Sequence, residues 1–195
     1  MDAKRLYYTV RLCLIRTNKG RGEYLRKHGI FRSVGHNFKY MPRTVPLYAN
    51  LIKLGDNVTV GSNAVFHTHD AVHSVTKNNK DRLPSQLRNV AFKEGLGCIE
   101  IGSDVYIADS VRIEHGVKIG DFVVVTTGSV VTNDIPSDSV VRGNPAKVVC
   151  SLTQYLTIKA AKKTYPDGFE HKMGSFVGKE LENWLWEDFD KSRQK

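Results

Sequence analysis

Between residues 101 and 136, an aliphatic side chain opens every successive block of six residues. The blocks read IGSDVY, IADSVR, IEHGVK, IGDFVV, VTTGSV and VTNDIP. The same register holds upstream in LGDNVT and VGSNAV, and Phe66 opens the block that follows. A repeat of this period is typical of a hexapeptide β-helix, in which each block supplies one short strand and one corner. The period therefore predicts an all-β solenoid core.

Three such blocks would complete one coil, and successive coils would stack at about 4.8 Å, the usual spacing of paired strands. The aliphatic side chains then point inward and form ladders, while the other positions of each block stay polar. The pairs expected to stack are Ile101 with Ile119, Ile107 with Val125, and Ile113 with Val131.

The repeat lapses from residue 67 to residue 100, where the sequence becomes polar and rich in Lys and Asn. Long loops within compact domains are usually functional or disordered. We therefore expect an excursion loop thrown out from one coil. Its root, VFHTHDAVHSV, carries His67, His69 and His73 together with Asp70.

The flanks of the repeat predict helices. We divide the chain into an N-terminal helical or irregular cap (1–47), a β-helix domain (48–150, excursion 67–100) and a C-terminal helical extension (151–195). RGEYLRKHGIF, LTQYLTIKAAKKT and GKELENWLWEDFDKSR have helical patterns. The opening MDAKRLYYTVRLCLI has an apolar run broken by Arg11 and lacks a small-residue cleavage site, so neither a signal peptide nor a transmembrane span is expected. An amphipathic helix that caps the fold or contacts a membrane surface is expected instead.

Charge and cysteine content narrow the function classes. Lys and Arg outnumber Asp and Glu by 29 to 20, which favours anionic partners. The basic residues are scattered rather than gathered in a nucleic-acid motif, so a phosphate-bearing small molecule is expected and nucleic acid is not. Three cysteines without a CxxC pair indicate neither a disulfide framework nor a zinc knuckle and fit a reducing cytoplasm. Of these, Cys98 is expected to be buried as a small apolar residue.

The hexapeptide run, the histidine-bearing loop and GNPAKVV at 143–149 together resemble the left-handed β-helix acyltransferases, in particular the sugar O-acetyltransferases and xenobiotic acetyltransferases. The resemblance covers roughly residues 48–150. It implies a left-handed parallel β-helix with helical caps, although parallel crossovers are generally right-handed. It also implies a homotrimer with active sites between subunits, acetyl-CoA as co-substrate, and no metal.

By the same resemblance, a histidine on the excursion loop is the general base, and the match to THD assigns this role to His69. Histidine suits it because its side chain exchanges a proton near neutral pH. His67 competes for the role. Asp70 and His73 would orient the base or contact the acceptor, or be ordinary polar residues of a loop. Asn50, in LYANL, matches an acceptor-binding asparagine.

The resemblance also assigns a donor site along the last coils. Thr127 and Gly128 would contact the pantetheine arm through their backbones, and Thr132 and Asn133 would lie near the adenosine. Arg142 and Lys147 would meet the CoA phosphates, or would be solvated charges. The full set of residues matched to the donor is Tyr106, Thr127, Gly128, Thr132, Asn133, Arg142 and Lys147.

The resemblance thus implies an acetyltransferase that moves an acetyl group from acetyl-CoA to a hydroxyl of a sugar, a surface polysaccharide precursor or a xenobiotic. Two alternatives stay open. The γ-class carbonic anhydrases bind zinc on the same prism through an HxxxxH pair and a distant histidine, whereas the spacings here are HxH and HxxxH. A non-catalytic trimeric scaffold would also be compatible with the fold.

Overall fold

The structure is a computed structural model that describes residues 3–77, 79–161, 165–169, 171–172 and 174–193. It divides into two compact units, Met1–Tyr155 and Leu156–Lys195, which we describe separately.

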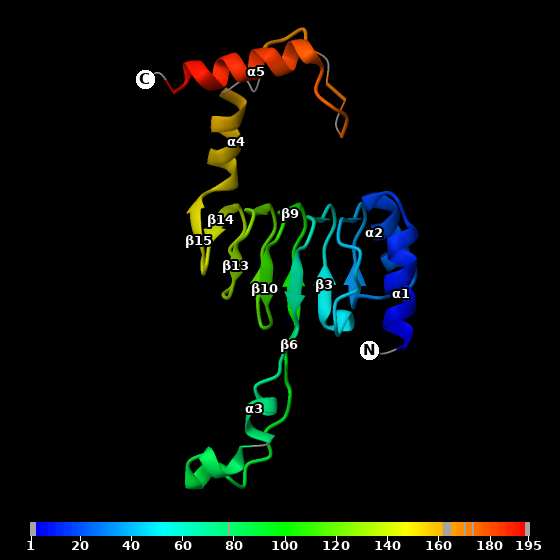
Figure 1. Ribbon diagram of the computed structural model, residues 1–195, viewed down its shortest axis with the longest axis vertical. Coiled ribbons are helices and arrows are strands. Elements are labelled where there is room, and N and C mark those ends of the chain that lie inside the picture. The colour runs from blue at the N-terminus through cyan, green and yellow to red at the C-terminus, as the bar shows by residue number, and fades with distance from the viewer. Residues whose placement is uncertain (1–2, 78, 162–164, 170, 173, 194–195) are drawn as a thin grey trace. The chain divides into compact units, whose positions relative to one another are not determined.

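Three sheets with parallel strands build the first unit, and the chain visits them in turn (Figure 1). The first sheet contains β1 (Ser33–Val34), β3 (Ile52–Leu54), β8 (Ile99–Ile101) and β11 (Lys118–Ile119). The second contains β2 (Lys39–Tyr40), β4 (Thr59–Val60), β9 (Val105–Ile107), β12 (Val123–Val125), β14 (Ser139–Gly143) and β15 (Ala146–Cys150), the last of which is antiparallel. The third contains β5 (Val65–His67), β10 (Arg112–Glu114) and β13 (Val130–Val131). We call this three-sheet array the coil.

The register of the strands confirms the ladders that the six-residue period predicts. Ile101 pairs with Ile119, Ile107 with Val125, and Ile113 with Val131. The upstream blocks keep the same register, since Leu54, Val60 and Phe66 pair with the first member of each of those pairs. All nine side chains are buried. Because burying one such side chain stabilises a fold by about 1.5–3 kcal/mol, these ladders are the main source of stability in the coil.

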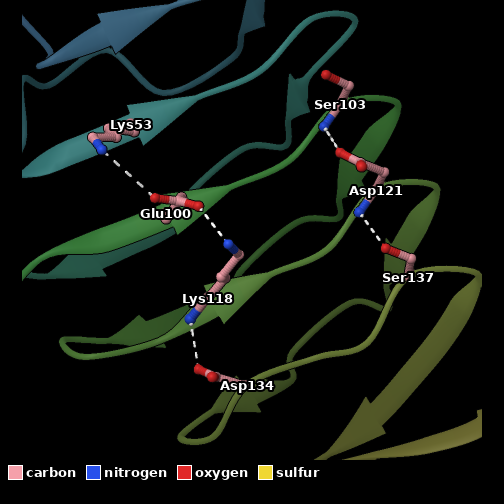
Figure 2. Close-up of polar contacts among 7 residues, drawn as sticks. All are labelled: Lys53, Glu100, Ser103, Lys118, Asp121, Asp134 and Ser137. Atoms are coloured by element: carbon pink, nitrogen blue, oxygen red, sulfur yellow. Dashed lines mark hydrogen bonds and ion pairs between the residues drawn. The ribbon is translucent and has the colours of Figure 1, made fainter.

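Glycines follow the strands of the first sheet because successive turns of the coil approach closely there. A Cβ atom on Gly55 would lie 2.6 Å from the carbonyl carbon of Gly102, and one on Gly102 would lie 2.8 Å from that of Gly120. Beside these stacked glycines, side chains of one turn accept hydrogen bonds from the backbone of the adjacent turn (Figure 2). The Ser103 N–H donates to Asp121 Oδ1 over 2.6 Å, and the Asp121 N–H donates to Ser137 Oγ over 2.9 Å.

An ion-pair ladder crosses the outside of the first sheet (Figure 2). Glu100 lies between Lys53 Nζ at 3.7 Å and Lys118 Nζ at 2.9 Å. The hydrogen bond and charge of Lys118 lower the pKa of Glu100, and Glu100 in turn raises the pKa of Lys118. The carboxylate therefore contributes stability that is lost as the pH falls, and the ammonium contributes stability that is lost as the pH rises. Because the side chains are exposed, the contribution is modest.

Two helices precede the coil, α1 (Ala3–Leu14) and α2 (Asn18–Lys27), and they confirm the predicted N-terminal helices. The Thr17 hydroxyl caps α2 by accepting the Gly20 N–H. The buried Arg21 side chain fixes α2 to the coil, since its Nε donates to the Tyr40 carbonyl over 2.9 Å. Strands β1 and β2 lie within residues 1–47, which the sequence analysis assigns to the cap. The proposed boundaries at 47 and 150 remain predictions.

At the end of the coil begins α4 (Leu152–Ala161), and α5 (Lys179–Lys191) belongs to the second unit. Both agree with the predicted C-terminal helices, apart from residues 162–164, which lie outside the described part of the chain. Within the second unit, Leu181 is buried and the rings of Phe169 and Trp184 lie 6.4 Å apart. Across the described residues, no helix has the length and apolar character that a membrane crossing requires.

Candidate active site

The excursion leaves the third sheet after His67 and returns to the first sheet at Ile99. Its root is a two-stranded antiparallel ribbon of β6 (His69–Asp70) and β7 (Gly95–Leu96), in which His69 pairs with Leu96. Its outer part contains α3 (His73–Lys77) and the 3-10 turns Lys80–Arg82 and Ser85–Leu87. Thr68 anchors the root, because its buried hydroxyl donates to the Leu47 carbonyl over 2.7 Å.

His69 lies on this ribbon, and its ring contacts Tyr48, which precedes the block LGDNVT in the sequence. The His69 side chain is half-buried, and its Nδ1 atom is buried without a hydrogen-bond partner in the described structure. The rings of His69 and Tyr48 pack edge to face, with their centroids 5.6 Å apart and their planes at 83°. Buried polar atoms are usually hydrogen-bonded, so His69 Nδ1 is a position where an ordered water, a ligand or another chain would complete the hydrogen bonding.

Tyr48 contacts residues from both ends of the excursion, His69 where it leaves the coil and Glu94 where it returns. The Tyr48 hydroxyl donates to Glu94 Oε2 over 2.9 Å, and this hydrogen bond is the main reason that the pKa of Tyr48 is raised. Its backbone is left-handed, with φ at 51°. A bulky residue adopts this conformation at a cost of about 1–3 kcal/mol, and it persists only where its surroundings hold it. The contacts with Glu94 and His69, and the hydrogen bond that the Tyr48 carbonyl accepts from the Leu51 N–H, help to hold Tyr48 in this conformation.

Replacing Tyr48 with phenylalanine tests this arrangement. The variant Tyr48→Phe keeps the ring against His69 but removes the hydrogen bond to Glu94. We expect kcat for the transfer proposed below to fall by about three- to tenfold, because His69, the base in that proposal, would be held less firmly. A wild-type kcat in Tyr48→Phe, with a loss only in Tyr48→Ala, would show that the ring matters and the hydroxyl does not.

Asp70 faces away from this pair. Its Oδ1 accepts the Val72 N–H over 3.0 Å, and its Oδ2 lies 3.9 Å from His115 Nε2. Gly95 stands opposite Asp70 in the ribbon, and a Cβ atom there would collide with the Asp70 carboxylate. These contacts give Asp70 a structural duty in shaping the root of the excursion, and its predicted contact with the acceptor stays a prediction.

The other two histidines have separate surroundings. His67 Nδ1 lies 3.1 Å from Glu114 Oε1 on the adjacent strand of the coil. His73 lines a hollow of about 230 Å³ in the excursion, where its Nδ1 is buried without a partner in the described structure. Over the residues that the structure describes, no group of three or more His, Cys, Asp or Glu side chains is placed to hold a metal ion.

Asn50 is exposed and borders a hollow of about 350 Å³ on the first sheet, together with Arg32 and Glu100. Cys98 borders the same hollow and is exposed, so the expectation that it would be buried is wrong. The reason is the alternation of the strand that follows, in which Ile99 points into the core. All three cysteines are free thiols.

The residues assigned to the donor lie on the second and third sheets and at their corners. Arg142 and Lys147 stand directly opposite each other in the β14–β15 hairpin, and both are exposed. Like charges in this position repel and destabilise a hairpin unless an anion lies between them. The pair is therefore suited to a phosphate group, as the sequence analysis expects, and the structure adds that the two residues face each other.

The remaining donor residues occupy outward positions. Tyr106 projects from β9 with 42% of its surface exposed. Thr127 and Gly128 form the corner between β12 and β13, where Gly128 has φ at 72°. Thr132 and Asn133 follow β13, and the Asn133 amide donates to the Thr132 hydroxyl over 3.0 Å.

Sequence reasoning missed Tyr48 and Glu94. Tyr48 was within reach, because it lies in the same LYANL stretch that carries Asn50. Glu94 gave no signal, since its nearness to His69 depends on how the two edges of the excursion pair. Only the folded ribbon places these residues on one site.

Comparison with known proteins identifies relatives of about half of the chain. No protein-family model matches the chain. A Staphylococcus aureus (strain COL) protein provisionally named an acetyltransferase is 41% identical over 116 residues, covering 50% of this chain and 54% of the relative. Galactoside O-acetyltransferase of Escherichia coli (strain K12) is 34% identical over 100 residues, covering 50% of this chain and 43% of that protein. The chain thus spans about half the length of these curated relatives.

Among solved structures, a hexapeptide-repeat acetyltransferase from Vibrio cholerae, complexed with acetyl coenzyme A, aligns with a TM-score of 0.56 at 23% identity. The alignment covers 77% of this chain and 86% of that one, and at this identity it shows the shared fold. The chain is therefore similar in sequence to proteins named as acetyltransferases, over about half of their length, and similar in fold to a hexapeptide-repeat acetyltransferase.

Proposed function

We propose that the protein transfers an acetyl group from acetyl-CoA to a hydroxyl group of a sugar or a similar acceptor, with His69 as the general base. The observation that carries the proposal is the placement of His69, half-buried at the root of the excursion and held against Tyr48. The names of the relatives support acetyl transfer, and that of the galactoside enzyme supports a sugar hydroxyl.

The proposed chemistry needs one base and no covalent enzyme intermediate. His69 takes the proton of the acceptor hydroxyl as its oxygen bonds to the thioester carbonyl carbon. The carbon–sulfur bond then breaks, and the coenzyme A sulfur receives the proton from His69. Acetylated acceptor and coenzyme A are the products, so atoms and charges balance.

Binding of the two substrates would fall to opposite parts of the first unit. Asn50, Asp70 and His73 are proposed on the acceptor side, where the hollows described above lie beside Asn50 and His73. Arg142 and Lys147 are proposed for the phosphates of acetyl-CoA, because their paired charges suit an anion. The other proposed donor contacts are Tyr106, Thr127, Gly128, Thr132 and Asn133.

The finer features of the family belong to the same proposal. We infer that the coil is a left-handed parallel β-helix and that three copies associate, with each active site between two of them. The buried, unpartnered Nδ1 of His69 supports an incomplete site in one chain. A cytoplasmic location is proposed from the three free thiols, which a reducing compartment preserves.

The test is release of coenzyme A from acetyl-CoA, followed with a thiol reagent, across a panel of sugars and hydroxyl-bearing antibiotics. Release that depends on an acceptor, and that continues with a metal chelator present, is the expected result. No release with any acceptor, together with stoichiometric zinc and carbon dioxide hydration, would replace the proposal with a zinc enzyme. No release and no binding of acetyl-CoA would indicate a scaffold.

A further inference from the structure

Helix α1 presents apolar side chains on two opposite faces. Leu12 is fully buried and Tyr8 packs against the same core. Leu6, Val10 and Leu14, spaced four residues apart, form a stripe along the other face, with Tyr7 beside them. The exposed fractions are 49% for Leu6, 58% for Tyr7, 53% for Val10 and 71% for Leu14. Packing of α1 on the coil explains the apolar face that contains Leu12 and Tyr8, and it does not explain the exposed stripe.

The charged residues of α1 and of the chain that follows it up to residue 22 are all basic. Residues 3–22 contain six Lys and Arg residues and no Asp or Glu. Among the six, Arg5 donates to the Val45 carbonyl and Arg21 donates to the Tyr40 carbonyl. Lys4 and Arg11 are exposed and lie seven residues apart, which places both on one flank of the stripe, next to Tyr7.

An apolar stripe flanked by cations is suited to the surface of an anionic membrane. The apolar side chains would enter the boundary between headgroups and acyl chains, and the cations would meet lipid phosphates. Tyrosine favours this boundary, because its ring is apolar and its hydroxyl is polar. Pairing with α1 of a second copy is disfavoured, because a twofold contact would bring the two sets of cations together.

We propose that α1 binds the protein to an anionic lipid surface through Leu6, Val10 and Leu14, with Lys4 and Arg11 on the headgroup phosphates. The helix lies at the outer end of the coil, beside α2 (Figure 1). Binding is peripheral, because α1 spans only 12 residues. This inference does not depend on the proposed acetyl transfer.

Co-sedimentation of the full chain with vesicles tests the proposal. Vesicles of phosphatidylcholine alone are compared with vesicles that also contain phosphatidylglycerol, at low and at high salt. We expect binding to the anionic vesicles that salt weakens, and about tenfold weaker binding to the neutral ones. The double variant Leu6→Gln/Leu14→Gln should lose binding to both, and Lys4→Gln/Arg11→Gln should lose the preference for the anionic vesicles and most of the salt dependence.

The matched control is Val148→Gln/Val149→Gln, which changes two exposed valines on β15 at the other end of the coil. It should bind vesicles like the wild type, and unchanged circular dichroism shows that each variant is folded. Equal sedimentation of the wild type and Leu6→Gln/Leu14→Gln would overturn the proposal. So would self-association without vesicles that this variant abolishes, because the stripe would then be an interface between copies.

Discussion

Replacing His69 with alanine should lower kcat for acetyl transfer by about 10²–10⁴-fold, the usual loss when a general base is removed. The KM for acetyl-CoA should change little, because the residues proposed for its phosphates lie on the β14–β15 hairpin rather than on the excursion. The side chain projects from a ribbon whose pairing uses backbone groups, so the variant keeps the root of the excursion intact. Steady-state kinetics with the best acceptor from the panel measures both constants.

His67→Ala is the control for this prediction. His67 lies two residues earlier and contacts Glu114 on the coil, so its loss should leave kcat within a few-fold of the wild type. Full activity in His69→Ala with a large loss in His67→Ala would move the catalytic role to His67.

Replacing Ile107 with alanine should destabilise the first unit by roughly 2–5 kcal/mol, the usual range for this change in a well-packed core. Ile107 is fully buried and stacks between Val60 and Val125. The coil has no second layer that could move into the space left behind. For a chain of this size, the change corresponds to a fall in Tm of roughly 4–20 °C. Thermal unfolding followed by circular dichroism measures it.

Tyr106→Ala is the control within the same strand. Tyr106 precedes Ile107 and points outward, so this variant should change Tm by only a few degrees. Both variants remove a large side chain from β9, and only one opens a cavity in the interior. Similar losses in the two variants would show that the outer face of β9 is buried by something other than this chain, such as a second copy.

Much of the fold could be predicted from the sequence because one physical requirement repeats every six residues. Each short strand places an aliphatic side chain in the interior, so the aliphatic residues at 101, 107 and 113 indicate the register. The first turns of the coil escaped because they break this rule. Phe38 and Tyr40 fill the interior there, in the same core as Leu25 of α2. Helix α2 stands where a further turn of the coil would otherwise lie. Aromatic residues at irregular spacing leave no period to detect.

The site was less predictable, because it depends on contacts between distant segments. His69 could be named through family resemblance, whereas spacing alone left three histidines equal. Tyr48 and Glu94 are 46 residues apart, and the bond between them depends on the path of the whole excursion. The facing charges of Arg142 and Lys147 depend on the pairing next to the turn of their hairpin, where Gly143 stands opposite Ala146. Such features follow from backbone geometry, which residue types alone do not determine.

The final strand, β15, also affects how the molecule behaves at high concentration. A stack of parallel strands has an open edge at each end, and an open edge can add a strand from another molecule and continue indefinitely. Here β15 runs antiparallel along the last rung with an irregular register, so the edge it presents no longer matches the strands of a second coil. At the opposite end, α2 packs against β2. Growth into fibres is thus discouraged at both edges of the second sheet by elements that lie outside the repeat.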